Sequence, residues 1–185
     1  MASFTDLNLS NAALESRGRE LGFSYSKPAA LVVIAGQKDL KRLPPSGVNA
    51  VESPNSELLR AACKRDAGLL LVNPLLVPQF RRDDGLVRAV AEAAEAAPVA
   101  FEIPLRPFLS SKFVFRAKLV SQVRTFLKLC LKLKAPFVFT SRAQTAFELK
   151  SPRELIAIGV FYGLSFEQAS AAISRTPQKL LEGLA

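Results

Sequence analysis

Short runs of strand-like sequence alternate with longer helical stretches through the first 140 residues of this chain. The runs that predict β-strands cover residues 4–8, 31–35, 48–52, 69–72, 99–103 and 137–140. The stretches that predict helices cover residues 11–21, 56–67, 86–97 and 113–134. Because strands that alternate with helices pair side by side in a parallel sheet, this order predicts an α/β fold built from βα units.

Three short helices are predicted after the last of these strands. They start near Ser151, Ser165 and Thr176, and the first two end near Tyr162 and Ile173. Six or seven strands covered by helices are compatible with an open doubly wound sheet or with a closed barrel. A full eight-stranded barrel usually needs about 250 residues, whereas this chain has 185. We therefore expect a compact, irregular, TIM-barrel-like β/α domain that spans residues 1–185.

The apolar content, 49% of all residues, is enough for a substantial core. The most hydrophobic stretch, residues 69–77, is interrupted by Asn73 and Pro74 and is well short of the roughly 18 residues that a membrane helix needs. Residues 1–10 do not resemble a secretory signal. We therefore expect a cytoplasmic protein with no membrane partner. Cys63 and Cys130 are each expected to be buried, reduced thiols.

Residues 103–147 contain no Asp or Glu but carry nine basic side chains. The other 140 residues hold 16 basic and 16 acidic side chains, so the net charge of +9 comes from this one segment. A localised excess of positive charge is typical of a surface that binds a polyanion. Nucleic acid is therefore the leading class of partner.

The predicted helix within this segment has two chemically distinct faces. At 100° per residue, one face carries Leu119, Val120, Val123, Phe126, Leu127, Cys130 and Leu131, and the other carries Ser121, Arg124, Lys128 and Lys132. Cations at four-residue spacing repel one another unless an anion binds them. This pattern favours an RNA-binding face, with a solvated helix face as the alternative.

Three further arginines need separate interpretation. Arg116 falls toward the apolar face, so either the helix starts after it or its side chain points into a cleft. Arg106 and Arg142 each follow a predicted strand, and in a parallel barrel both positions lie at the C-terminal mouth, where binding residues collect. There they are expected to contact phosphates or, alternatively, to pair with Asp6, Glu52 or Glu102.

The chain contains no histidine and only two cysteines, far apart in the sequence, so a Ser-His-Asp triad, a Cys-His pair and an ordinary zinc site are excluded. Catalysis by this chain alone is therefore not expected, and no catalytic or metal-binding residue is assigned. Asp6, Glu52 and Glu102 remain candidates for a weak Mg²⁺ site at the barrel mouth, with ion pairs or capping contacts as the alternative.

Several motifs resemble the thirty-kilodalton protein subunit of ribonuclease P, called protein component 3 in archaea. They are Phe101-Glu-Ile-Pro-Leu-Arg106, then Arg116, Arg124 and Lys132, then Pro136-Phe-Val-Phe-Thr-Ser-Arg-Ala143, and Ser151-Pro-Arg-Glu-Leu155 with Gly163-Leu164. The first half of the chain matches more loosely, through Phe4-Thr-Asp-Leu7 and Asp83-Asp-Gly85. The resemblance covers the second half of the chain well.

The resemblance implies a barrel related to metal-dependent phosphoesterases of the polymerase-and-histidinol-phosphatase type. It implies an accessory subunit of the ribonucleoprotein that removes the 5′ leader of precursor tRNA, in which the RNA performs the cleavage and requires Mg²⁺. The implied partners are the ribonuclease P RNA, a small RRM-like protein in a heterodimer or heterotetramer, other ribonuclease P proteins and, indirectly, precursor tRNA. No cofactor of the protein itself is implied.

Residues matching the recurring basic positions of that family are the first candidates for RNA contact: Arg106, Arg116, Arg124, Lys132 and Arg153. Lys128 and Arg142 are added from their positions, although many relatives carry a smaller residue where this chain has Arg142. The phosphoesterase relatives begin with Asp-x-His-x-His, whereas this chain has Asp6-Leu-Asn-Leu-Ser10. Two alternatives remain: an autonomous metal-dependent phosphoesterase and a generic basic RNA-binding scaffold. Phe147, Phe161, Tyr162 and Phe166 are candidates for partner packing or for the core.

Overall fold

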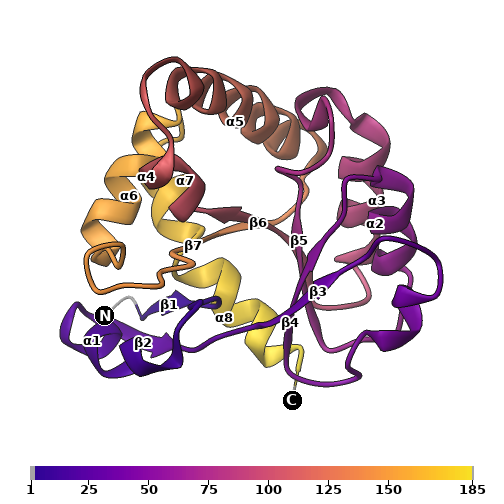
Figure 1. Cartoon of the computed structure of the whole chain (residues 1–185), viewed down its shortest axis with the longest axis horizontal. Coiled ribbons are helices and arrows are strands. Elements are labelled where there is room, and N and C mark those ends of the chain that lie inside the picture. The colour runs from indigo at the N-terminus through magenta and orange to yellow at the C-terminus, as the bar shows by residue number, and fades with distance from the viewer. Residues whose placement is uncertain (1–2, 185) are drawn as a thin grey trace.

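The computed structural model describes residues 3–184 and shows two parallel sheets surrounded by helices (Figure 1). One sheet has the strand order β3-β4-β5-β6-β7, and the other pairs β1 with β2. The strand bounds are β1 Phe4–Asp6, β2 Phe23–Ser26, β3 Ala30–Val33, β4 Val48–Glu52, β5 Leu69–Asn73, β6 Val99–Pro104 and β7 Phe137–Thr140. All of these pairs are parallel, as the alternation of strands and helices predicts.

The two sheets adjoin at both sides and together form an irregular β/α barrel. On one side, β2 of the small sheet and β3 of the large sheet are separated by residues 27–29 alone, so the chain passes almost directly from one sheet into the other. On the other side, the chain beyond β7 bonds to the chain beyond β1: Arg142 N donates to Asn8 O at 3.0 Å, and Ser10 N donates to Ala143 O at 3.2 Å. The TIM-barrel-like expectation is therefore confirmed, with an incomplete hydrogen-bonded ring.

The helices lie mainly outside the five-stranded sheet. Their bounds are α1 Glu15–Glu20, α2 Ser56–Cys63, α3 Asp84–Ala93, α4 Arg106–Ser110, α5 Phe113–Leu133, α6 Pro152–Phe161, α7 Phe166–Ala171 and α8 Arg175–Glu182. Short 3-10 turns precede α1, follow β3 and precede α3. Ser151 and Ser165 each cap a C-terminal helix through a capping box, as their spacing predicts. No helix within residues 3–184 is long and apolar enough to cross a membrane.

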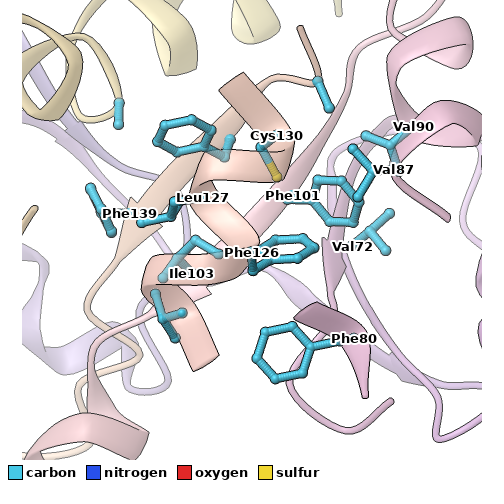
Figure 2. Packing of buried hydrophobic residues seen from close by; sticks show 14 of the residues in the cluster. Val72, Phe80, Val87, Val90, Phe101, Ile103, Phe126, Leu127, Cys130 and Phe139 are labelled. Carbon is cyan, nitrogen blue, oxygen red and sulfur yellow. The ribbon is translucent and has the colours of Figure 1, made fainter. Parts of the chain in front are cut away.

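The main core lies between the outer face of the five-stranded sheet and helices α2, α3, α5, α6 and α7. Figure 2 shows Phe126 of α5 between Phe101 of β6 and Phe80. Its ring centroid is 4.9 Å from that of Phe101 and 5.3 Å from that of Phe80, both in edge-to-face geometry. Cys63 and Cys130 are buried free thiols in this core, as expected, and burial raises the pKa of both. The core fixes the orientation of α5 and thereby exposes its opposite face.

A second, smaller core fills the inside of the barrel. It joins side chains of the inner sheet face to Leu180 of α8: Leu7, Leu69, Leu71, Ala100 and Val138. In the view of Figure 1, α8 is drawn between β1 and β4, and it contacts both β1 and β7. The central strand β5 is covered on both faces and is therefore buried along its whole length and mostly apolar, whereas the edge strand β3 is largely exposed.

Two elements were absent from the prediction, β2 and α4. The strand β2 is only four residues long and alternates aromatic side chains with serine. The helix α4 has five residues and carries Pro107 in its first turn. The helix α4 is shorter than the window over which helical periodicity is informative, and β2 has only the minimum length at which alternation indicates a strand. The predicted helix at residues 113–134 corresponds closely to α5.

Candidate nucleic-acid interface

The long helix α5 presents a row of cations to solvent. Arg124, Lys128 and Lys132, here called the α5 cation row, are exposed, whereas Phe126 and Cys130 are buried on the other face. At 1.5 Å per residue, successive cations of the row lie about 6 Å apart along the helix axis. No salt bridge joins a member of the row to a carboxylate within residues 3–184. The row therefore keeps its positive charge toward solvent.

Arg124 is held in place by Phe161, at the end of α6. Its Nε donates to the backbone oxygen of Phe161 at 3.0 Å, and its Nη2 donates to the same oxygen. The guanidinium carbon lies 5.1 Å from the centroid of the Phe161 ring, within the range of a cation–π contact. Arg124 thus has a fixed position without losing its charge to an acidic neighbour.

Arg116 is held in a comparable way by the segment before α5. Its Nε donates to the backbone oxygen of Ser111 at 2.9 Å, and its Nη2 donates to that of Leu109 at 3.3 Å. Its guanidinium carbon lies 5.3 Å from the Phe108 ring centroid. Because α5 begins at Phe113, the interpretation in which the helix starts after Arg116 is wrong. The side chain lines a groove instead, which is the alternative that its position on the helical wheel left open.

This groove, here called the α5 groove, lies between α4, α5 and the end of α6. Its volume is about 860 Å³. Its lining combines aromatic, small and basic side chains: Phe108, Phe113, Arg116, Ala117, Val120, Ser121, Arg124, Thr125, Lys128 and Phe161. No acidic residue is among them. The groove is therefore an electropositive hollow with aromatic walls.

Arg106 and Arg153 lie on the elements beside this groove. Arg106 begins α4, and its Nε lies 3.4 Å from Oε1 of Glu148. It therefore does not pair with Asp6, Glu52 or Glu102, and its side chain remains 40% exposed. Arg153 lies in the first turn of α6 and is exposed. Both side chains can reach solvent, although the charge of Arg106 is partly balanced by Glu148.

Arg142 has a different environment, inside the barrel mouth. Its Nε donates to Oε1 of Glu102 at 2.9 Å, and its two terminal nitrogens form salt bridges with Glu102 and Glu52. Its side chain is only 13% exposed. Burial favours a lower pKa for Arg142, but the charges and hydrogen bonds of Glu102 and Glu52 outweigh it and raise the pKa. The ion-pair alternative for Arg142 is the one that this geometry favours.

Polar side chains complete a hydrogen-bonded network around these two glutamates. Oε1 of Glu102 accepts from Thr140 Oγ1 at 2.6 Å and from Asn8 Nδ2 at 2.8 Å. Oε1 of Glu52 accepts from Asn73 Nδ2 at 2.6 Å. These donors come from the ends of neighbouring parallel strands, where polar groups meet in such a fold. The carboxylate oxygens are thus directed toward protein donors.

Asp6 is the third carboxyl group of the mouth. It is fully buried, and desolvation raises its pKa to about 6, although hydrogen bonds from Ser141 and Asn8 act in the opposite direction. The backbone nitrogens of Ser141 and Asn8 each lie 3.2 Å from Oδ1 of Asp6. Among the described residues, no group of three acidic, cysteine or histidine side chains is arranged to hold a metal ion.

The aromatic residues divide between surface and core. Tyr162 is buried, whereas Phe147, Phe161 and Phe166 are at least half exposed.

Two groove residues, Phe108 and Phe113, were not singled out from the sequence. Phe113 stands at the start of an otherwise amphipathic helix, next to Val114 and Phe115, and three apolar residues in succession on a helix must include exposed ones. That signal was present in the sequence.

A protein-family model described as RNase P subunit p30 matches residues 48–183 of this chain. Three ribonuclease P protein component 3 sequences illustrate the range of similarity. That of Methanosarcina acetivorans is 38% identical over 104 residues, which cover 56% of this chain and 44% of the relative. That of Methanothermobacter thermautotrophicus is 31% identical over 132 residues, or 71% of this chain and 53% of the relative. That of Thermococcus gammatolerans is 28% identical over 177 residues, or 93% and 80%.

The chain thus spans about half of the length of the Methanosarcina and Methanothermobacter relatives. Among solved structures, a chain from a cryo-EM structure of archaeal ribonuclease P with mature tRNA has a similar fold. The TM-score is 0.66 at 17% sequence identity, and the match covers 98% of this chain and 81% of that one. The similarity in structure therefore extends through the first half of the chain, which the family model covers only in part.

Proposed function

Because the chain belongs to the RNase P subunit p30 family, we propose that it is a protein subunit of ribonuclease P that contacts the RNA of the enzyme through α5. The reaction is removal of the 5′ leader from precursor tRNA. In this proposal the RNA carries out the cleavage with Mg²⁺, and the protein supplies no catalytic group. Its other partners are a small RRM-like subunit and further proteins of the same particle, with precursor tRNA contacted indirectly.

The observation that carries the RNA contact is the α5 cation row. Three cations stand at equal spacing on a rigid helix, and the segment around them contains no acidic residue between Ile103 and Phe147. Arg116 extends the same surface at the start of the helix, and Arg106 begins α4, whose Phe108 lines the groove. Arg153 is exposed in the first turn of α6, at the other end of that helix from Phe161, and is proposed as a separate RNA contact. We keep Arg142 outside this surface, because its guanidinium is buried between two glutamates.

The proposed mechanism is electrostatic. Phosphates of a folded RNA repel one another, and cations on a protein surface offset that repulsion. Because these cations are already fixed in place, they act even when the concentration of free cations is low. Release of counterions from the RNA supplies much of the binding free energy. Contacts of this kind fix position more than they read sequence. The shape of the RNA and the partner proteins then determine specificity.

The deciding experiment measures cleavage of precursor tRNA by the cognate ribonuclease P RNA at low Mg²⁺ concentration. The RNA is assayed alone, with this protein, with the small RRM-like subunit, and with both proteins. Stimulation that requires the RNA and is largest with both proteins supports the proposal. Cleavage by this protein without RNA identifies an autonomous phosphoesterase, and equal affinity for unrelated RNA without stimulation identifies a generic scaffold.

A further inference from the structure

The start of α5 exposes three apolar residues in succession. Phe113, Val114 and Phe115 are 89%, 76% and 79% exposed. Isolated exposed hydrophobic residues are ordinary, but a contiguous exposed group beside a hollow is typical of a binding surface. Phe113 also has a φ of 44°, in the left-handed region that a bulky side chain rarely adopts. Phe113 is the first residue of α5 and lines one end of the α5 groove, here called its entrance.

Phe113 and Phe161 contribute aromatic surface to the same groove. Phe161 is 50% exposed and carries the Arg124 guanidinium against its ring. Small side chains, those of Ala117 and Ser121, lie on α5 between Phe113 and the cation row and leave the hollow open. Aromatic faces and cations are therefore offered to one ligand from a single surface.

We propose that the α5 groove binds an unpaired stretch of RNA, with bases stacked on Phe113 and Phe161 and phosphates placed on Arg124 and Lys128. The inference rests on the proposed RNA contact of α5 and specifies which form of RNA this part of the surface takes. Single-stranded nucleic acid is bound by aromatic platforms combined with a positive groove, since every base has a face that can stack.

Paired RNA fits this groove less well. In a duplex the base faces are stacked on one another, so an exposed phenyl ring cannot stack on them. Proteins therefore contact mainly the phosphates and sugars of a duplex. The cation row alone would suffice for such contacts. The spacing of about 6 Å between Arg124 and Lys128 is comparable to the separation of neighbouring phosphates in an extended strand. The charge of the groove, which has basic but no acidic lining residues, favours a polyanion over a protein.

The chain offers a clean spectroscopic test, because it contains no tryptophan. The variant Phe113→Trp places a single indole at the groove entrance. A short oligouridine and an RNA duplex of the same length are titrated into the full-length variant at fixed low salt. Quenching of the indole by oligouridine, with little change on adding duplex, is expected. An indole that neither RNA quenches, although both bind, overturns the proposal.

Affinity measurements on Phe113→Ala supply a second readout. Since stacking on one aromatic ring contributes about fivefold or more in affinity, we expect Phe113→Ala to weaken oligouridine binding by at least that factor and to leave duplex binding unchanged. The control is Phe147→Ala, which removes an equally exposed ring outside the groove, at 90% exposure. Equal losses for Phe113→Ala and Phe147→Ala, or for both RNAs, overturn the proposal.

The same titrations separate this inference from the function on which it rests. If Lys128→Ala weakens the binding of both oligouridine and duplex, and Phe113→Ala weakens the binding of neither, then α5 binds RNA but the groove does not bind unpaired bases. If neither RNA binds and Lys128→Ala changes nothing, the RNA contact itself fails. A shift of the Phe113→Trp emission on adding the small RRM-like protein without RNA assigns the aromatic entrance to a protein and overturns the proposal.

Discussion

Arg142 donates from Nε to Oε1 of Glu102 at 2.9 Å, and a second nitrogen of the same guanidinium binds the other oxygen of that carboxylate. Glu102 is completely buried, and Glu52 binds the remaining terminal nitrogen of Arg142. The guanidinium is thus an internal cation at the mouth of the barrel. Arg142 was a candidate for RNA contact, and Glu52 and Glu102 were candidates for a weak Mg²⁺ site, with ion pairing as the alternative for all three. In the structure these three residues form ion pairs with one another.

Removing this cation should destabilise the fold strongly. Arg142→Ala leaves Glu102 as an uncompensated buried charge, and breaking such a pair typically costs about 3–5 kcal/mol. Arg142→Lys keeps the positive charge and should therefore restore part of the stability. It should not restore all of it, because an ammonium cannot bind both carboxylate oxygens in the same plane. Urea unfolding measures the effect, with Arg153→Ala as the control for loss of an exposed arginine. A loss for Arg142→Ala no larger than for Arg153→Ala would contradict the internal role of this ion pair.

The buried Asp6 should make stability depend on pH in an unusual direction. Its pKa in the folded protein is about 6, above its value of 3.8 in the unfolded chain. Between these values the folded state holds a proton that the unfolded state has lost, so stability falls as pH rises through this window. At about 1.4 kcal/mol per pH unit, the contribution is about 3 kcal/mol. Other carboxyl groups titrate in the same range, so the measurement is the difference between the wild type and Asp6→Asn. A constant difference between pH 4 and 7 would rule out this assignment.

The local features of the chain were predictable because they follow from periodicity and capping. On α5, a spacing of 100° correctly separates the exposed cations from the buried residues Val120, Val123, Phe126, Leu127 and Cys130. At the two ends of the predicted apolar face, Leu119 is only partly buried and Leu131 is exposed. The serine caps of α6 and α7 follow from a serine with Glu154 or Gln168 three positions later. Asp6, Glu52 and Glu102 were expected at one mouth because parallel strands end on the same side. These arguments use only neighbours along the chain or the common direction of the strands.

The groove and the partners of the arginines depend on tertiary packing, which periodicity does not encode. The backbone oxygen that holds Arg124 belongs to Phe161, 37 residues later, and the carboxylate near Arg106 belongs to Glu148 in an irregular segment. Arg142 adopts a φ of 47°, which turns the chain sharply after β7 and is not indicated by its residue type. Sequence reasoning identified the cations but not which of them are neutralised.

The edge-to-face contacts of Phe126 predict that this side chain is critical for stability. Phe126 is completely buried between α5 and the sheet, and Phe→Ala substitutions at such sites typically cost about 3–5 kcal/mol. Phe126→Ala should therefore lower the melting temperature by many degrees. Phe166→Ala, which removes a ring that is 63% exposed, serves as the control and should change the melting temperature little. Calorimetry on both variants tests the assignment of α5 to the main core.

The α5 cation row predicts a defect that depends on Mg²⁺. Arg124→Ala removes one fixed charge from the row, so activity of the reconstituted ribonuclease P should fall most at low Mg²⁺ and recover as Mg²⁺ replaces the missing cation. Arg106→Ala should show a smaller effect, because Glu148 already balances part of its charge. For Arg124→Ala, the slope of log affinity against log salt should decrease in magnitude by about one, as expected for loss of one phosphate contact.

Arg88→Ala provides the matched control, since Arg88 is an exposed cation on α3, outside the acid-free segment. If Arg88→Ala and Arg124→Ala reduce activity equally at every Mg²⁺ concentration, the effect is one of net charge, and the row is not the contact surface.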